Sequence, residues 1–436
     1  MPSAHDPSPA TVTVTAAPDA SALRGFKKLR HVAKLLSALH DGGCARDAAG
    51  NRELHFDDYV LLVLLFLFNP MIDSMRALQR VADLAEVQKK LGVRRFSLGS
   101  FSESCRVFEP HKLQGVIEQL APGLHPVGRR QVFKDLPHII ELVDGTIVDT
   151  LCTVARAMYV TRVDGSRQHA FKLHLGFEVD RHVPTNFAVT DARGTGGPGG
   201  SDERAVLRKR LAPGRTYVMD RGYAQFRLFN DIHAIASSYV CRVRDNTAPA
   251  AVREDRPLGD RDRAAGVISD RVVTLGKRSG SSAECDHPVR LVCVKIAPHA
   301  KRGKYKGGTS GPASDGVPRI ATDLLDAPAY VIAFLYRSRW TVEVFIRFFK
   351  QTLGCRHLLS TREQGVDIQV YAAVIACMML NTLTGKKPGK WMVTLMSLYL
   401  AGWAGEADVL RELTREDSAG VKRRAKEELW KKLGVN

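Results

Sequence analysis

The stretch YRSRWTVEVFIRFFKQTL, residues 336–353, carries the most informative pattern in this chain. It contains neither Gly nor Pro, and its apolar residues recur at helical spacing, so we expect a helix. At about 100° per residue, Tyr336, Arg339, Glu343 and Lys350 share an arc of roughly 60°. A separate apolar stripe would face the core, and it comprises Leu335, Phe345, Ile346, Phe349 and Leu353. A carboxylate among cations, beside an aromatic hydroxyl, suits a site for metal ions and phosphates.

Two interpretations of this polar ridge stay open on the ridge alone. A solvent-exposed helix face with ion pairs such as Arg339–Glu343 would look the same. The spacing Y-x2-R-x3-E-x6-K, however, resembles the signature of the IS-four group (transposon-five-like) of bacterial DDE insertion-sequence transposases. The flanking residues agree with that family: they are Arg339-Trp340, Lys350-Gln351, Leu353-Gly354, His357-Leu358 and Ser360. The resemblance implies two more carboxylates upstream.

The composition is that of a basic globular protein of 436 residues, long enough for two or more domains. A net charge of +18 and a pI near 9.7 favour a polyanionic partner, with nucleic acid first and an anionic membrane second. The eight cysteines form no C-x2-C pair, which argues against a structural zinc site and favours reduced cytosolic thiols. The N-terminus is no signal peptide, and the apolar run 59–68 is too short to span a bilayer. We therefore expect a soluble, cytoplasmic, nucleoid-associated protein without a membrane partner.

The N-terminal third shows helical periodicity. Residues 1–24 are rich in Ala, Pro, Ser and Thr and are expected to be disordered. Residues 25–130 are expected to form an all-helical domain, because helical segments are separated by Gly and Pro. The family resemblance implies that this domain helps to bind the element ends. A helical domain with basic ends is common, and no clear helix-turn-helix is present.

Strand patterns begin at His138. HIIELVDGTIVDT alternates, and we expect Asp144-Gly145 to end a buried strand at a turn. TYVMDRGY is expected to close a later strand at Asp220. Strands followed by alternating helices and strands resemble the ribonuclease-H-like α/β fold, a mixed sheet flanked by helices. In that fold, the resemblance implies, the carboxylates of Asp144, Asp220 and Glu343 meet.

The expected catalytic domain is split. Its parts are residues 131–245 and 322–385, interrupted by a β-rich insertion at 246–321 and followed by a C-terminal helical region at 386–436. The insertion ends in a basic loop that could track a DNA backbone or simply be solvated; its candidate residues are Lys301, Arg302, Lys304 and Lys306. Hairpin-forming relatives carry a Trp in this insertion, whereas the Trp residues here are 340, 391, 403 and 430. A hairpin step is therefore in doubt.

The family resemblance implies a mechanism. Asp144, Asp220 and Glu343 would hold two Mg²⁺ (or Mn²⁺) ions for phosphodiester cleavage at inverted-repeat ends, and the freed 3′-OH would then attack target DNA. Arg339 would clamp a phosphate, and Lys350 and Tyr336 would contact the DNA. Arg221 and Lys172 are further candidates for phosphate contacts, although each could be a plain surface cation. The partners would be double-stranded DNA and a second subunit in a synaptic homodimer.

The sequence offers three alternatives to this function. The loop 194–199 matches G-x-G-x-x-G, but Pro198 stiffens it, βαβ repeats are lacking and the charge does not suit a dehydrogenase. A metal-dependent nuclease on the same fold would cleave without joining. A transposase-derived DNA-binding regulator would do neither.

Overall fold

The computed structural model of the chain describes residues 27–42, 46–47, 50, 52–69, 71–127, 131–149, 158–161, 167–192, 202–245, 247, 249–276, 284–295, 317–352, 358–400 and 403–414. The expected disordered tail 1–24, the glycine-rich loop 194–199 and the basic loop 301–306 lie outside these residues.

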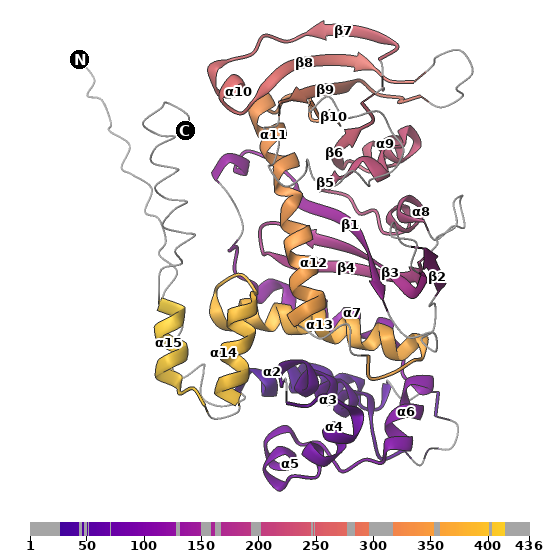
Figure 1. Ribbon diagram of the computed structural model, residues 1–436, viewed down its shortest axis with the longest axis vertical. Coiled ribbons are helices and arrows are strands. Elements are labelled where there is room, and N and C mark those ends of the chain that lie inside the picture. Colours follow the sequence, from indigo (N-terminus) through magenta and orange to yellow (C-terminus); the bar gives the residue numbers. More distant parts are fainter. Residues whose placement is uncertain are drawn as a thin grey trace, which may run out of the picture.

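A ten-stranded sheet organises the described part of the chain (Figure 1). Its order is β2-β3-β1-β5-β6-β10-β9-β8-β7, and β4 pairs with β3 off this path. The strands are β1 (Ile139–Asp149), β2 (Met158–Thr161), β3 (Arg167–Glu178), β4 (Val183–Asp191), β5 (Arg215–Met219), β6 (Ser238–Val243), β7 (Ala251–Asp255), β8 (Val267–Thr274), β9 (Val289–Val294) and β10 (Arg319–Thr322). The fold is therefore a mixed α/β architecture.

Strand β1 separates an antiparallel part of the sheet from a parallel part. Strand β1 runs antiparallel to β3 but parallel to β5, and β5 runs parallel to β6. Helices α8 (Glu203–Arg208) and α9 (Phe226–Ala234) provide the crossovers that parallel neighbours need. Strands β5 and β6 are buried along most of their length, which explains their nearly continuous apolar sequences, TYVM and YVCRV.

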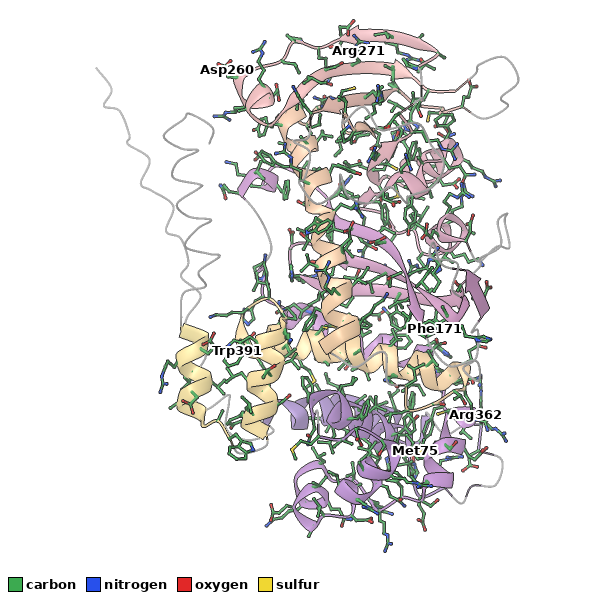
Figure 2. The ribbon with its side chains drawn as sticks, in the orientation of Figure 1. Met75, Phe171, Asp260, Arg271, Arg362 and Trp391 are labelled. Carbon is green, nitrogen blue, oxygen red and sulfur yellow. The ribbon has the colours of Figure 1, made fainter. Side chains whose placement is uncertain are left out.

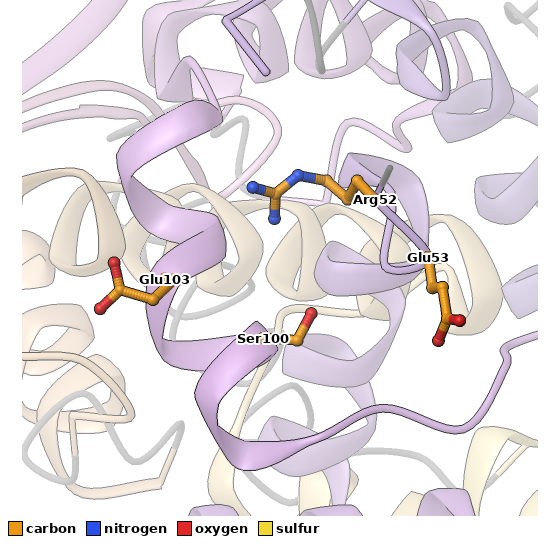
Figure 3. Close-up of a pocket in the computed structure, with 4 residues that line it drawn as sticks. All are labelled: Arg52, Glu53, Ser100 and Glu103. Atoms are coloured by element: carbon orange, nitrogen blue, oxygen red, sulfur yellow. The ribbon is translucent and has the colours of Figure 1, made fainter. Parts of the chain in front are cut away.

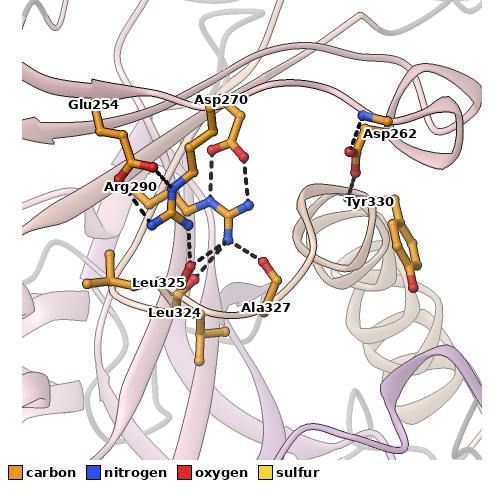
Figure 4. Close-up of polar contacts among 10 residues, drawn as sticks. Glu254, Asp262, Asp270, Arg290, Leu324, Leu325, Ala327 and Tyr330 are labelled. Carbon is orange, nitrogen blue, oxygen red and sulfur yellow. Dashed lines mark hydrogen bonds and ion pairs between the residues drawn. The ribbon is translucent and has the colours of Figure 1, made fainter.

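The β-rich stretch continues the same sheet. Strands β7, β8 and β9 form an antiparallel meander with the short helix α10 (Asp260–Ala264), and β10 pairs with both β6 and β9. A buried ion pair supports this region: Arg290 binds Asp270 with both Nε and Nη2, at 2.8 and 2.7 Å (Figure 4). The third guanidinium nitrogen donates to the carbonyls of Leu324, Leu325 and Ala327. The meander is thereby tied to the segment that leads into the next helix.

Helices form the opposite end of the molecule (Figure 1). They are α2 (Lys27–Leu36), η1 (Ser37–Leu39), α3 (Phe56–Phe68), α4 (Met75–Ala82), α5 (Ala85–Leu91), α6 (Leu98–Val107), η3 (Pro110–Lys112), α7 (Leu113–Leu120), η4 (Ala121–Gly123) and η5 (Gln131–Phe133). Side-chain caps start two of them, because the hydroxyls of Ser74 and Ser97 accept bonds from the backbone of α4 and α6. Helix α3 is buried on nearly every side.

One long helix joins this helical end to the sheet. Helix α13 (Glu363–Thr384) packs against α3, α7 and β4. By length and composition α13 could cross a membrane, yet 78% of its apolar window is buried within the protein. It is therefore a core helix. Helices α14 (Lys390–Leu400) and α15 (Glu406–Thr414) follow it at the side of the molecule (Figures 1 and 2).

Two expectations about local structure are wrong. The expected helix 336–353 is instead two helices, α11 (Ala329–Ser338) and α12 (Trp340–Thr352), with Arg339 between them. The hydroxyl of Ser338 donates back to the carbonyl of Phe334 at 2.9 Å, a bond that bends or interrupts helices.

The first strand is also longer than expected. Asp144 does not end β1 but lies within it, because β1 keeps pairing with β3 as far as Asp149 opposite Ala170. On its other side, pairing with β5 ends at Leu142 opposite Val218. From Asp144 onward, β1 therefore has no pairing with β5. The two strands separate at this point, and the candidate site lies in the opening between them.

Candidate active site

Two aspartates lie at the opening between β1 and β5. Asp144 lies two residues beyond the last β1–β5 pair, and Asp220 directly follows β5. Each carboxylate accepts a bond from a nearby glycine: Gly145 N lies 2.9 Å from Asp144 Oδ1, and Gly222 N lies 2.8 Å from Asp220 Oδ1. The second bond caps the turn η6 (Arg221–Tyr223). The parallel pairing of β1 and β5 therefore places both aspartates at this opening, which is the arrangement that the family resemblance implied.

The third carboxylate comes from α12, which packs on β1. Glu343 lies in the first turn of this helix. The pKa of Asp144 is raised to about 7, chiefly by burial; the charge of Arg339 opposes the rise, and the carboxylates of Asp220 and Glu343 add to it. Asp220 and Glu343 are thus close enough to Asp144 for their charges to act on it. The structure thus brings the three predicted carboxylates together.

Arg339 is the cation at the centre of this group. Its guanidinium hydrogen-bonds Glu343 and lies 3.9 Å from Asp144 Oδ2. Burial lowers the pKa of Arg339, but Glu343, Tyr336 and Asp144 outweigh that effect and raise it. Tyr336 is half-buried, and its burial raises the pKa of its hydroxyl although Arg339 opposes the rise. Without bound DNA or metal, Arg339 therefore balances the charge of Glu343 and Asp144.

The other predicted cations have different surroundings. Lys350 donates a hydrogen bond to the carbonyl of Ile147 and so ties the end of α12 to β1. Arg221 is exposed beside Asp220, on η6. Lys172 pairs with Glu203 at 2.7 Å and is mostly buried. The basic-loop residues Lys301, Arg302, Lys304 and Lys306 lie outside the described residues.

A fourth carboxylate, which the sequence did not single out, lies beside the two aspartate–glycine segments. Glu203 begins α8, where an acidic residue has an ordinary explanation in the helix dipole. Its position became apparent only from the contacts of Gly145 and Gly222. The sequence does carry one signal for a neighbouring group: a glycine follows each aspartate within two residues, and glycine permits close approach of another side chain.

The donor set fits a divalent cation such as Mg²⁺ or Mn²⁺. Carboxylate oxygens are the ligands that such hard cations prefer. Burial raises the pKa of Asp144 most, and repulsion from the carboxylates of Asp220 and Glu343 adds to the rise although Arg339 opposes it. A bound cation would relieve that repulsion, so Asp144, Asp220 and Glu343 could hold one or two ions.

A polar hollow in the helical end is separate from this site. It is lined by Arg52, Glu53, Ser100 and Glu103 (Figure 3). Arg52 donates to Ser104 Oγ at 2.8 Å, and Glu103 pairs with Arg362, the residue before α13 (Figure 2). The first contact joins the segment before α3 to α6, and the second joins α6 to the start of α13, so the hollow has a structural explanation.

Comparisons with known proteins show what the chain is similar to. Residues 137–379 match the family model described as a transposase DDE domain. A Sinorhizobium fredii protein described as a transposase, y4zB, is 26% identical over 58% of this chain and 63% of its own length. A Geobacillus stearothermophilus protein described as a probable transposase for the insertion sequence element IS5377 is 24% identical over 69% of this chain and 70% of its own length. A piggyBac transposase synaptic complex with hairpin DNA gives a TM-score of 0.41 at 12% identity, over 92% of this chain and 84% of that one.

Proposed function

The chain belongs to the transposase DDE domain family, and from that premise we propose that it is an insertion-sequence transposase. It binds the inverted-repeat ends of its element, cleaves them and joins the 3′-OH ends to target DNA. The observation that carries this proposal is the convergence of Asp144, Asp220 and Glu343 at the opening between β1 and β5. The net charge of +18 supports a DNA partner.

The sheet supports a ribonuclease-H-like catalytic domain. Strands β1, β3 and β4 form an antiparallel meander, and β5 and β6 add in parallel on the other side of β1. We assign this domain to residues 131–245 and 322–385, with 246–321 as its insertion. Residues 25–130 are then the DNA-binding helical domain, and 386–436 a helical region for contact with a second subunit.

Each site residue has a role in this proposal. Asp144, Asp220 and Glu343 would hold two Mg²⁺ (or Mn²⁺) ions, which would supply activation of a water or 3′-hydroxyl nucleophile and charge stabilisation for the leaving oxygen. Arg339 holds Glu343 in place and offers its fork of donors to a DNA phosphate. Lys350 keeps α12 on β1 and places positive charge near the DNA backbone.

The outer cations extend the DNA path. Arg221 is exposed next to Asp220, so a phosphate at the cleavage site can reach it. Tyr336 offers a hydroxyl near the same phosphate. The basic loop with Lys301, Arg302, Lys304 and Lys306 would follow the backbone further along.

The test is a plasmid that carries the inverted repeats flanking this protein's gene, incubated with the protein and Mg²⁺. We expect cleavage at the repeat ends and joined products, both absent with Asp144→Ala. Cutting without end specificity or joining would instead establish a nuclease. Binding without cleavage would establish a DNA-binding regulator.

A further inference from the structure

The carboxylate of Glu203 lies between the two aspartate–glycine segments. A Cβ atom on Gly145 would lie 2.5 Å from Glu203 Oε1, and a Cβ on Gly222 would lie 3.3 Å from Glu203 Oε2. The Cβ atom on Gly222 would also lie 3.0 Å from Asp220 Oδ1. Two carboxylates, those of Glu203 and Asp220, therefore approach one glycine. The carboxylate of Glu203 therefore occupies space that a side chain at either glycine position would fill.

Glu203 has a cationic partner from the neighbouring strand. Lys172 Nζ lies 2.7 Å from Glu203 Oε1, and Lys172 is on β3 opposite Ile147 of β1. The side chains of Lys172 and Glu203 are 20% and 26% exposed, so solvent screens their interaction less than it screens a surface pair. Lys172 therefore supplies positive charge directly at this carboxylate.

A buried hydroxyl faces the same group of carboxylates. Tyr223 is 1% exposed, and its hydroxyl has no hydrogen-bond partner among the residues that the structure describes. Burial raises the pKa of Tyr223 most, followed by the charges of Glu203, Asp144 and Asp220. Buried hydroxyls are normally satisfied, so this atom indicates a place for a further ligand such as water.

Together, these contacts extend the proposed transposase site, on which the inference rests. We propose that Glu203 is a fourth acidic group of the divalent-cation site, and that Lys172 is the counter-ion that pairs with it when no cation is bound. Removing the two partners of this pair then has opposite effects on cation affinity. Loss of the carboxylate weakens binding, and loss of the competing ammonium strengthens it.

The experiment measures Mn²⁺ binding to the full-length, DNA-free protein, by the loss of the free-Mn²⁺ electron paramagnetic resonance signal. We expect Glu203→Gln to weaken binding about tenfold, the scale seen when groups around a metal are removed. Lys172→Met should tighten binding. The matched control is Asp231→Asn, which breaks the 2.7 Å pair between Arg208 of α8 and Asp231 of α9. It should leave the affinity unchanged, and melting curves establish that each variant is folded.

The outcomes separate this inference from the proposed function. Opposite shifts for Glu203→Gln and Lys172→Met support it. The inference is overturned if both variants change the Mn²⁺ affinity in the same direction. It is also overturned if neither variant changes the affinity while Asp144→Ala still abolishes binding. Either result leaves the three-carboxylate site intact. Wild-type protein with no saturable Mn²⁺ binding would contradict the metal site of the proposed function, and this inference with it.

Discussion

The guanidinium of Arg339 lies 3.9 Å from the carboxylate of Asp144, joining the break between α11 and α12 to the middle of β1. Both side chains are mostly buried, at 17% and 18% exposure. The same guanidinium binds Glu343. One cation therefore serves two carboxylates, and without a bound metal the site retains excess negative charge.

Burial of Asp144, reinforced by the charges of Asp220 and Glu343, should make the metal-free protein less stable as pH rises. The pKa of Asp144 is raised from 3.8 to about 7, so ionising this carboxyl costs folding free energy progressively above pH 4. Asp144→Asn cannot ionise and should match the wild type near pH 4 but exceed it at pH 8, by at most about 4 kcal/mol. Urea unfolding in EDTA at both pH values measures the difference. A difference independent of pH would show that Asp144 is not perturbed.

Removing the charge of Glu343 should separate DNA binding from cleavage. Glu343→Gln keeps the size of the side chain and an acceptor for Arg339 but loses a ligand charge. We expect end binding within about threefold of the wild type and cleavage reduced by at least about a thousandfold. Gel-shift and cleavage assays with Mg²⁺ measure the two effects. Glu254→Gln, on the exposed strand β7, is the control that should retain both activities. Efficient cleavage by Glu343→Gln would remove this residue from the metal site.

Lys350 should contribute one charge to DNA binding. Lys350→Ala is expected to weaken end binding and to reduce the slope of log affinity against log salt by about one. The control is Lys386→Ala, because Lys386 likewise donates to a backbone carbonyl, that of Glu412. Titrations at several salt concentrations give both slopes. If the two variants show the same slope, Lys350 has only the structural role of holding α12 to β1.

The ion pair between Arg290 and Asp270 should be essential for stability. Asp270→Ala would leave a buried guanidinium uncompensated, and we expect a loss of about 3–5 kcal/mol in the free energy of unfolding. The pair of Arg271 on β8 and Asp255 on β7 is 48% and 70% exposed, so Asp255→Ala should cost less than about 1 kcal/mol. Chemical denaturation compares the two. Equal losses in the free energy of unfolding would mean that burial does not determine how much each ion pair stabilises the protein.

The sequence predicted best what depends on residue spacing. The distances along Y-x2-R-x3-E-x6-K place Arg339 beside Glu343 on one helical face, and that pair is present. Strand patterns placed Asp144 and Asp220 on two separate strands, and the family resemblance implied that the two strands are neighbours. Their meeting with Glu343 required the family resemblance, since no local pattern states that α12 packs on β1.

The sequence predicted poorly what depends on partners distant in the chain. Asp-Gly suggested a turn at residue 144, but β3 offers pairing up to Asp149, and the β-branched residues after Gly145 suit a strand. The interruption at Arg339 coincides with a hydroxyl bond from Ser338 to Phe334, which helical periodicity does not reveal. Glu203 was hidden because an acid at a helix start needs no further explanation.

The position of β10 between β6 and β9 has a consequence for synthesis of the protein. The ribosome completes β6 well before β10, and until then β6 exposes an unpaired edge. Such edges are sites of aggregation, so the nascent chain is vulnerable during that interval. A premature stop codon before residue 319 would release a product with Asp144 and Asp220 on an open-edged sheet and without Glu343. Truncated copies of this gene should therefore give products that are cleared or aggregated rather than inhibitors that accumulate.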